Sequence, residues 1–516
     1  MFNYSKRLKG RELPFILIPL FIFIVCSRWE LIYTNDSFQY LKMAYLFSNG
    51  QLPLTDKWMP LYSIFIGLVH IITKLSLLQS AYIVNVIFFV LTLALLSQMI
   101  KSIHTTTYAF FILACCLIPL NKYFITSSLT IMGELPMLFW TLLFIIQFNK
   151  TILDQNWSVG NITLLSFIIL CSIFTKYNGL ILFVMMILGI LVYDNASNKY
   201  FKALLSSLII LTPYVIWSRL KSKEDVILTA MAKNSFIDNV FINLQDLFKT
   251  LIEFLFNENI YMKINARIPS HYQIVLMAVI LIIISIKLFQ EFKNKVNSIG
   301  LILLGFSLFY ITSLLILLST AGVNEMNTRT LLYPLIALII YLFTLIKREN
   351  SRTVIRCTTI SFIIMIAFFN GSKLIDNTRK LYISGSGSLN QDFCKNQNQT
   401  LDFIKEYMYQ HQLSPQQIHT NENKLLPIYL DYSIMVPLPT NSTWKGNYQI
   451  DKSKEEIDRE VELLSEQISR ENHIICFLGK QHKIIFPLHY EKHFTDSTQF
   501  KIYQFIDGFV ITSKDH

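Results

Sequence analysis

The segment Tyr33–Ala44, with the sequence YTNDSFQYLKMA, places Asp36 directly after the first long apolar run of the chain. That run, from Leu13 to Tyr33, has about the 20 residues that a helix needs to cross a hydrocarbon core roughly 30 Å thick. The sequence therefore predicts that Asp36 lies at a membrane surface. Apolar residues then recur at helical spacing as far as Ser48-Asn49-Gly50, which predicts a short amphipathic helix in the interface.

The composition is that of a multi-spanning membrane protein. Of the 516 residues, 53% are hydrophobic and the mean hydropathy is +0.44, whereas roughly 45–50% apolar residues are usual in soluble domains. The net charge of +11 does not indicate nucleic-acid binding, because the basic residues are scattered through short loops between apolar spans. Their distribution indicates the orientation of the chain in the membrane instead.

The apolar segments predict about eleven membrane spans by length. In chain order they are Leu13–Tyr33, Tyr82–Ile100, Tyr108–Leu120, Ile131–Phe148, Ile162–Phe174, Gly179–Tyr193, Leu204–Trp217, Ile274–Phe289, Gly300–Leu318, Leu331–Ile346 and Cys357–Phe369. The segment Pro60–Leu75 is short and carries His70 and Lys74. We expect it to be a second helix embedded in the outer leaflet and not a crossing.

Positive charge sets the expected orientation. The basic run Lys6–Arg11 precedes the first span, which places the N-terminus in the cytoplasm and Asp36 on the outer side. The short loops that this count places inside agree with the rule, since they carry Lys101, Lys150, Lys199, Lys202, Lys293, Lys295, Lys347, Arg348, Arg352 and Arg356. The long stretch Arg219–Tyr272, which the count places outside as a loop, also carries basic residues, but long loops cross largely regardless of charge. We expect a multi-pass protein of a bacterial cytoplasmic (inner) membrane, since the chain carries no organelle-retrieval signal.

The sequence predicts two domains, a membrane domain over residues 1–371 and a small soluble α/β domain over residues 372–516. In the second domain, Leu401–His411 and Lys454–Ile468 have helical periodicity, His473–Leu478 is typical of a buried strand, and Tyr503–Thr512 is typical of a hairpin. The span count places this domain on the outer, extracytoplasmic face.

Two carboxylates are candidate catalytic residues. Acids at membrane depth cost roughly 2.5–3.5 kcal/mol even on the lenient insertion scales, so Asp36 and Glu134 are functional candidates. Together they could supply a general base for an attacking hydroxyl or bind a divalent metal ion. The structural alternatives are that Asp36 caps the helix that follows it and that Glu134 complements the dipole of its own helix.

Two basic residues are candidate phosphate ligands. Arg329 heads the run Arg329–Pro334 (RTLLYP), and a guanidinium matches phosphate oxygens and stays charged. Lys176 lies in the turn Lys176–Gly179 (KYNG) on the same expected face. The alternatives are a snorkelling arginine and an ordinary turn lysine. His271 and Glu325 border outer loops and are weaker candidates for metal binding.

These residues, in this order, resemble the GT-C superfamily of polytopic glycosyltransferases that use a polyprenyl-phosphate sugar, in particular the protein mannosyltransferases and the lipid A aminoarabinose transferases. In that superfamily the first outer loop opens with an acid followed by a tyrosine and an alanine at four-residue steps, and Asp36, Tyr40 and Ala44 match. The start of the second interfacial helix, the second acid, the basic-aromatic-x-Gly turn and the late arginine are similar to Pro60-Leu61-Tyr62, Glu134, Lys176–Gly179 and Arg329. The resemblance covers residues 1–371.

The chain departs from the superfamily pattern at two positions. Many relatives have Asp-Glu in the first loop, whereas Ser37 follows Asp36 here, which argues against a mechanism with adjacent acids. Thr330 stands where an aromatic residue often follows the arginine.

The resemblance implies a membrane glycosyltransferase that moves a sugar from a polyprenyl-phosphate donor to a lipid, glycan or protein acceptor at the outer face, with inversion. In this hypothesis Asp36 and Glu134 are catalytic, while Tyr40, Lys176 and Arg329 bind substrate; the need for a divalent metal ion stays open. The sequence also allows a transporter or flippase of a lipid-linked saccharide, in which the same charges line a path, and a polysaccharide polymerase or ligase.

Overall fold

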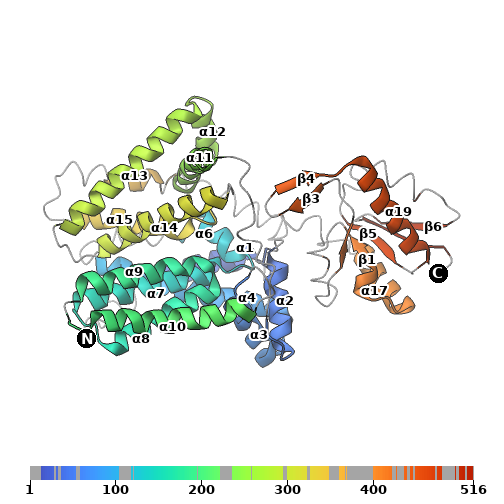
Figure 1. Cartoon of the computed structure of the whole chain (residues 1–516), viewed down its shortest axis with the longest axis horizontal. Coiled ribbons are helices and arrows are strands. Elements are labelled where there is room, and N and C mark those ends of the chain that lie inside the picture. The colour runs from blue at the N-terminus through green and yellow to red at the C-terminus, as the bar shows by residue number, and fades with distance from the viewer. Residues whose placement is uncertain are drawn as a thin grey trace.

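The computed structural model describes residues 13–27, 31–32, 36–53, 58–103, 118–119, 121–194, 196–220, 235–256, 258–293, 299–321, 326–347, 359–366, 368, 399–420, 426, 435–438, 442–445, 448–470, 473–478, 494, 499–505 and 508–514. A large group of helices occupies one region of the structure, and the strands with two further helices occupy another (Figure 1). The fold is thus a polytopic helical protein with a small α/β part near the C-terminus.

The helices of the first region follow the apolar segments of the sequence. They are α1 (Leu13–Ser27), α2 (Ser37–Ser48), α3 (Leu61–Thr73), α4 (Leu77–Ile103), α6 (Lys122–Leu129), α7 (Glu134–Leu153), α8 (Val159–Thr175), α9 (Leu180–Tyr193), α10 (Lys199–Leu220), α11 (Phe236–Leu255), α12 (Glu258–Asn265), α13 (Ser270–Lys293), α14 (Ile299–Ala321) and α15 (Leu332–Lys347). Among the described residues, five helices are long and apolar enough to cross a membrane, namely α4, α7, α10, α13 and α14. Shorter apolar helices lie in α1, α3, α8, α9 and α15.

The predicted spans agree with these helices in position. The predicted span Tyr108–Leu120 lies outside the described residues except for residues 118–119, and only residues 359–366 and 368 of Cys357–Phe369 are described. The two predicted interfacial helices are present as α2 and α3, which pack against each other. The number of membrane crossings stays a prediction.

Two helices of one segment, α11 and α12, were not expected from the sequence. The segment from Arg219 to Tyr272 is a long outer loop in the sequence-based expectation, but it contains α11 and α12. Helix α11 is amphipathic, and its buried face packs against α13 and α14. Two amides on this face bind the end of α14: Asn239 Nδ2 donates to the Ser319 carbonyl at 3.1 Å, and Asn243 Nδ2 donates to Ser319 Oγ at 3.1 Å. The apolar residues of α11 recur at helical spacing in the sequence, but the assignment of the whole stretch as a loop overlooked this pattern.

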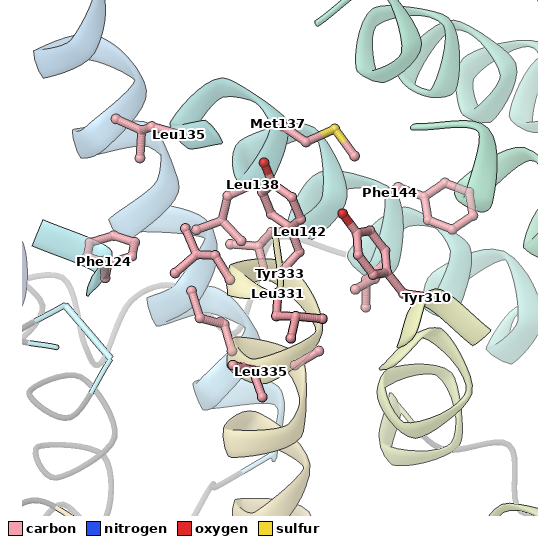
Figure 2. Close-up of a cluster of buried hydrophobic side chains, with 14 of the residues drawn as sticks. Phe124, Leu135, Met137, Leu138, Leu142, Phe144, Tyr310, Leu331, Tyr333 and Leu335 are labelled. Carbon is pink, nitrogen blue, oxygen red and sulfur yellow. The ribbon is translucent and has the colours of Figure 1, made fainter. Parts of the chain in front are cut away.

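The core of the helical region lies where α7 meets α4, α14 and α15. Figure 2 shows Leu138 and Leu142 of α7 facing Tyr310 of α14 and Tyr333 and Leu335 of α15. All five side chains are at most 2% exposed. Because interiors are packed at crystal-like density, this contact fixes α7 against the two late helices.

The C-terminal region is built on a five-stranded mixed sheet. Its strands are β1 (Ile418–Thr420), β2 (Val436–Pro437), β5 (Ile474–Leu478), β6 (Phe500–Gln504) and β7 (Gly508–Ser513), in the spatial order β2-β1-β5-β7-β6. β1 is parallel to β2 and β5, whereas β7 is antiparallel to β5 and β6. A separate two-stranded hairpin consists of β3 (Ser442–Lys445) and β4 (Tyr448–Asp451).

Two helices cover opposite faces of this sheet. Ile474 and Cys476 of β5 pack with α17 (Gln399–His411), whereas Ile475 and Phe477 pack with α19 (Lys454–Arg470). A strand that is buried on both faces has a continuous apolar sequence, as IICFL does here. The two predicted helices, the buried strand and the hairpin of this region are confirmed. The boundary between residues 371 and 372 lies outside the described residues and stays a prediction.

A histidine pair in this sheet predicts acid sensitivity. His419 of β1 is 5% exposed, and its Nε2 lies 2.8 Å from Nδ1 of His473. Burial, with His473 adding to it, lowers the pKa of His419 to about 4. The side chain of His419 is therefore protonated near pH 6.5 in the unfolded chain but only near pH 4 in the folded chain. The contribution of this histidine to the stability of the fold is fully present above pH 6.5 and is lost as the pH falls toward 4. The slope is at most about 1.4 kcal/mol per pH unit for one such group.

This prediction is checked by calorimetry of the full chain between about pH 4 and pH 7. The transition of the C-terminal region should move to lower temperature as the pH falls, and His419→Gln should remove most of that movement. His411→Gln, on α17, is the matched control. An equal pH dependence in wild type and His419→Gln would contradict the assignment to this pair.

Candidate active site

Backbone hydrogen bonds bring the chain segments that carry Asp36 and Glu134 next to each other. Ile32 accepts from the Ile131 amide at 3.2 Å and donates to the Leu129 carbonyl at 2.8 Å. Ser37 Oγ donates to the Ile131 carbonyl at 3.0 Å. The start of α2 is therefore joined to the segment that leads into α7, and the acids at the start of each helix become neighbours.

A buried amide holds the same segment from the other side. Asn85 of α4 is fully buried; its Nδ2 donates to the carbonyls of Ser128 at 2.9 Å and Thr130 at 3.0 Å. Its Oδ1 accepts from the Tyr62 hydroxyl of α3 at 2.6 Å. One side chain thus ties α3 and α4 to the end of α6, four residues before Glu134. This contact explains why α7 begins at Glu134 and not at Ile131, where the predicted span begins.

Helix α11 positions the turn that carries Arg329. Thr250 Oγ1 of α11 donates to the Met326 carbonyl, three residues before the arginine. Asn327 Oδ1 then accepts from the amides of Arg329 at 3.1 Å and Thr330 at 3.0 Å. This side-chain cap precedes α15 and fixes the direction in which the arginine leaves the backbone.

Lys176 ends α8 in an extended conformation and enters the short turn Tyr177–Gly179. A Cβ on Gly179 would lie 2.5 Å from the Ile173 amide nitrogen, so only glycine allows the turn to fold back so closely on α8. Gly133 lies against this layer, since a Cβ there would be 3.2 Å from Lys176 Cγ and 3.1 Å from the Tyr40 hydroxyl. Lys176 and Tyr40 therefore both approach the first turn of α7.

The four charged residues form one cluster. Arg329 Nη2 lies 2.7 Å from Asp36 Oδ2, and Arg329 Nε is bonded to Glu134 Oε1. Lys176 Nζ lies 2.9 Å from the same Glu134 oxygen. Two carboxylates thus alternate with two cations along the order Asp36, Arg329, Glu134, Lys176. Residues separated by up to 293 positions meet in this cluster.

The members of the cluster differ in exposure. The side chain of Glu134 is 1% exposed, Lys176 15%, Asp36 26% and Arg329 38%. Asp36 and Arg329 are therefore the residues that a ligand can reach first. Glu134 lies beneath them, where its N-terminal position in α7 also favours negative charge.

Burial and charge act against each other at Arg329. Burial alone would lower the pKa of Arg329, but the carboxylates of Glu134 and Asp36 outweigh it and raise the pKa above its ordinary value. Burial, with Glu134 adding to it, raises the pKa of Tyr40 well above its ordinary value. Arg329 is therefore permanently cationic, and Tyr40 is a neutral hydroxyl beside the cluster.

Two buried oxygen atoms at the site have no hydrogen-bond partner among the described residues, Glu134 Oε2 and the Tyr333 hydroxyl. Both residues are 1% exposed. Figure 2 shows the Tyr333 hydroxyl pointing toward the start of α7. Buried polar atoms of this kind are usually satisfied by water or ligand, so they indicate where a polar group enters the site.

The donor set fits a divalent metal ion poorly. Both carboxylates already bind cationic side chains, and a metal ion between them would have to displace Arg329. The ring of His271 packs against that of Tyr272, tilted by 43° with centroids 4.2 Å apart, and Glu325 lies outside the described residues. No group of three His, Cys, Asp or Glu side chains with metal-binding geometry occurs in the described part of the chain.

All five residues predicted as catalytic or substrate-binding therefore lie in or against one cluster. The residues that position them were missed, chiefly Asn85, Asn327 and Thr250. The sequence does indicate a role for Asn85, because an amide side chain in the middle of an apolar span is costly unless its hydrogen bonds are formed within the protein. The cap by Asn327 is also a known local pattern.

Asn85→Leu is expected to lower the free energy of unfolding by about 2–5 kcal/mol, because the Tyr62 hydroxyl and two carbonyls lose their buried partner. Thermal unfolding of the purified protein in detergent measures the change. Asn198→Leu, at an exposed position before α10, is the control. A loss no larger than that of the control would contradict the role of Asn85 as a structural tie.

Comparison with solved structures identifies the fold. ArnT from Cupriavidus metallidurans in the apo state matches with a TM-score of 0.50 and 13% sequence identity, over 98% of this chain and 98% of that chain. The same protein bound to undecaprenyl phosphate matches with a TM-score of 0.49 and 12% identity, over 97% and 98% of the two chains. The archaeal oligosaccharyltransferase AglB from Archaeoglobus fulgidus, in complex with an inhibitory peptide and a dolichol-phosphate, matches with a TM-score of 0.44 and 12% identity, over 99% of this chain and 75% of that chain.

The likeness to apo ArnT over nearly the whole of both chains shows that this chain has the same fold as that protein, which confirms the predicted class of a polytopic helical protein with a small α/β region. No protein-family model matches the chain, and a search of curated proteins found no relative.

Proposed function

We propose that the chain is an integral membrane glycosyltransferase that moves a sugar from a polyprenyl-phosphate donor to an acceptor hydroxyl. The observation that carries the proposal is the alternating cluster of Asp36, Arg329, Glu134 and Lys176 at the end of an apolar helical bundle. An exposed acid beside cations suits a reaction in which one hydroxyl loses a proton and a phosphate departs.

Arg329 and Lys176 each have more N–H groups than their ion pairs in the cluster use, and these groups can bind phosphate. An arginine has five N–H groups and a lysine three. Among the described residues, Arg329 uses one on Asp36 and one on Glu134, and Lys176 uses one on Glu134. The remaining donors can bind the bridging phosphate of the donor, and Tyr40 closes the site from α2.

The proposed step is a single displacement. The acceptor oxygen forms a bond to the anomeric carbon while the bond from that carbon to the phosphate oxygen breaks. The proton of the acceptor passes to a carboxylate oxygen of Asp36, and the electron pair of the broken bond leaves with the polyprenyl phosphate, whose charge Arg329 and Lys176 offset. One displacement inverts the anomeric configuration. No step is assigned to a metal ion.

The test is direct measurement of cleavage. The purified protein in lipid vesicles is incubated with a panel of radiolabelled polyprenyl-phosphate sugars, and release of free polyprenyl phosphate is followed with and without a chelator. Release on addition of an acceptor is the expected result, and an unchanged rate with chelator agrees with the poor fit of the site to a metal ion. Movement of the intact lipid-linked sugar across the bilayer without release would instead identify a transporter.

A further inference from the structure

A second site lies at the other end of the helical bundle. Helices α7, α9, α13 and α14 line a partly open cavity of about 570 Å³. Phe148 and Ile152 of α7 contribute to its wall. Since Phe148 follows Glu134 by fourteen positions, a rise of 1.5 Å per residue places the cavity about 21 Å along α7 from the charged cluster. The cavity is therefore separate from the candidate active site.

The lining of the cavity is apolar. Leucine, isoleucine and phenylalanine side chains predominate, for example Leu188, Leu288, Phe289 and Leu308. α13, which forms one wall, exposes most of its surface to the surroundings of the bundle. In a membrane protein, an apolar cavity beside a lipid-facing helix suits hydrocarbon and not water, because water would find no polar partners there.

The rim of the cavity carries positive charge. Lys293 follows Phe289 by one helical turn on the same face of α13 and is exposed. Lys199 approaches the end of α9, where its Nζ lies 3.4 Å from the Leu191 carbonyl. Neither lysine makes an ion pair with a described residue.

The acids at this end of the bundle are mostly neutralised. Asp194, at the end of α9, lies 2.7 Å from Lys202 Nζ, and Glu291 lies 4.0 Å from Lys287 Nζ. The exposed Asp154 is outnumbered by the exposed or half-buried lysines Lys150, Lys199 and Lys293 at the same end. An apolar cavity with a cationic rim at the end of a membrane helix matches an anionic lipid, with the acyl chain inside and the head group at the rim.

We infer that this cavity is a binding site for one anionic glycerophospholipid, whose acyl chain fills the space between α7, α9, α13 and α14 and whose phosphate contacts Lys293. The sequence-based orientation places this end in the cytoplasmic leaflet. The site is independent of the proposed transferase activity, and its test does not use that activity.

Trp157 provides a reporter. It is 4% exposed, so lipids around the bundle cannot reach it, and its ring lies 6.1 Å from that of Phe148 in the cavity wall. An acyl chain brominated in its middle should quench this tryptophan only from inside the cavity. The full-length protein in vesicles is therefore compared in brominated phosphatidylglycerol and brominated phosphatidylcholine at equal mole fraction, with Trp157→Phe to assign the signal.

Gly305 allows the cavity to be filled. Gly305 lines the cavity, and a Cβ there would meet only Leu288 Cδ1, at 3.7 Å, so a side chain can be added at this position without a close contact at Cβ. Gly305→Phe should abolish the quenching of Trp157, whereas Ile282→Phe, on the exposed face of α13, should leave it unchanged. Lys293→Gln should keep quenching but remove the preference for phosphatidylglycerol, and this variant decides the question if Gly305→Phe does not fold.

Three results would overturn the inference. Full quenching in Gly305→Phe would show that the lipid does not enter the cavity. Equal quenching by the two lipids in the wild type would show that the rim does not select charge. Relief of quenching by added polyprenyl phosphate would show that the tail of a polyprenyl lipid occupies this space instead.

Discussion

Asp36→Asn is expected to lower the turnover of sugar transfer by about 100- to 10,000-fold, the range found when a general base is removed. The folded protein should survive, because the side chain of Asp36 is 26% exposed and the asparagine oxygen can still accept from Arg329. The amide cannot take up the proton of the acceptor. Release of polyprenyl phosphate under saturating donor measures the loss, and thermal unfolding in detergent measures the fold.

Asp402→Asn is the matched control for this change, since Asp402 is an exposed acid on α17 far from the cluster in sequence. It should affect neither measurement. A fully active Asp36→Asn protein would remove Asp36 from the proposed mechanism. A variant that is inactive only because it is unfolded would assign Asp36 to the structure and not to the chemistry.

Glu134→Gln is expected to behave differently, with a loss of about 3–5 kcal/mol in the free energy of unfolding. Glu134 is 1% exposed and accepts from both Lys176 and Arg329 through one oxygen. Its neutral replacement leaves two buried or half-buried cations with Asp36 as their remaining acid in the cluster. We expect poor yield of folded protein and a lower unfolding temperature.

A second substitution distinguishes charge imbalance from loss of shape. Lys176→Met removes one cation, so the double variant Glu134→Gln with Lys176→Met again has one acid and one base, Asp36 and Arg329. It should be more stable than Glu134→Gln alone, which is a coupling that a double-mutant cycle measures. Additive losses in the double variant would mean that the side chain of Glu134 acts through packing.

The residues of the site could be predicted from the sequence, but the ion pairs and hydrogen bonds between them could not. Asp36, Glu134, Lys176 and Arg329 stand out because charge at membrane depth is costly. Their pairing is not encoded locally, because Arg329 meets partners 195 and 293 positions away. The sequence-based hypothesis therefore assigned Arg329 to phosphate alone, whereas in the structure it first bridges the two acids.

The fold was predictable where one physical signal dominates. Long apolar runs indicated the spans, and the alternation of strand and helix indicated the α/β region. Helix α11 was missed because the stretch between two predicted spans was assigned as a loop, although its residues have the periodicity of an amphipathic helix that packs against α13 and α14. The start of α7 was misplaced by three residues for a different reason, since Asn85, Ile32 and Ser37 hold the preceding segment in another conformation.

The alternation of acids and bases in the cluster has a consequence for product release. Two negative and two positive side chains leave no net charge to retain an anion. In the proposed reaction the donor is a phosphodiester with one negative charge, and the product is a phosphomonoester with about −1.5 to −2 at pH 7. A site with surplus positive charge would hold this product more tightly than the donor and would slow each cycle. The carboxylates of Asp36 and Glu134, which stay bonded to Arg329, instead offset the positive charge that would hold this product, so the same acids that prepare the site also favour product release.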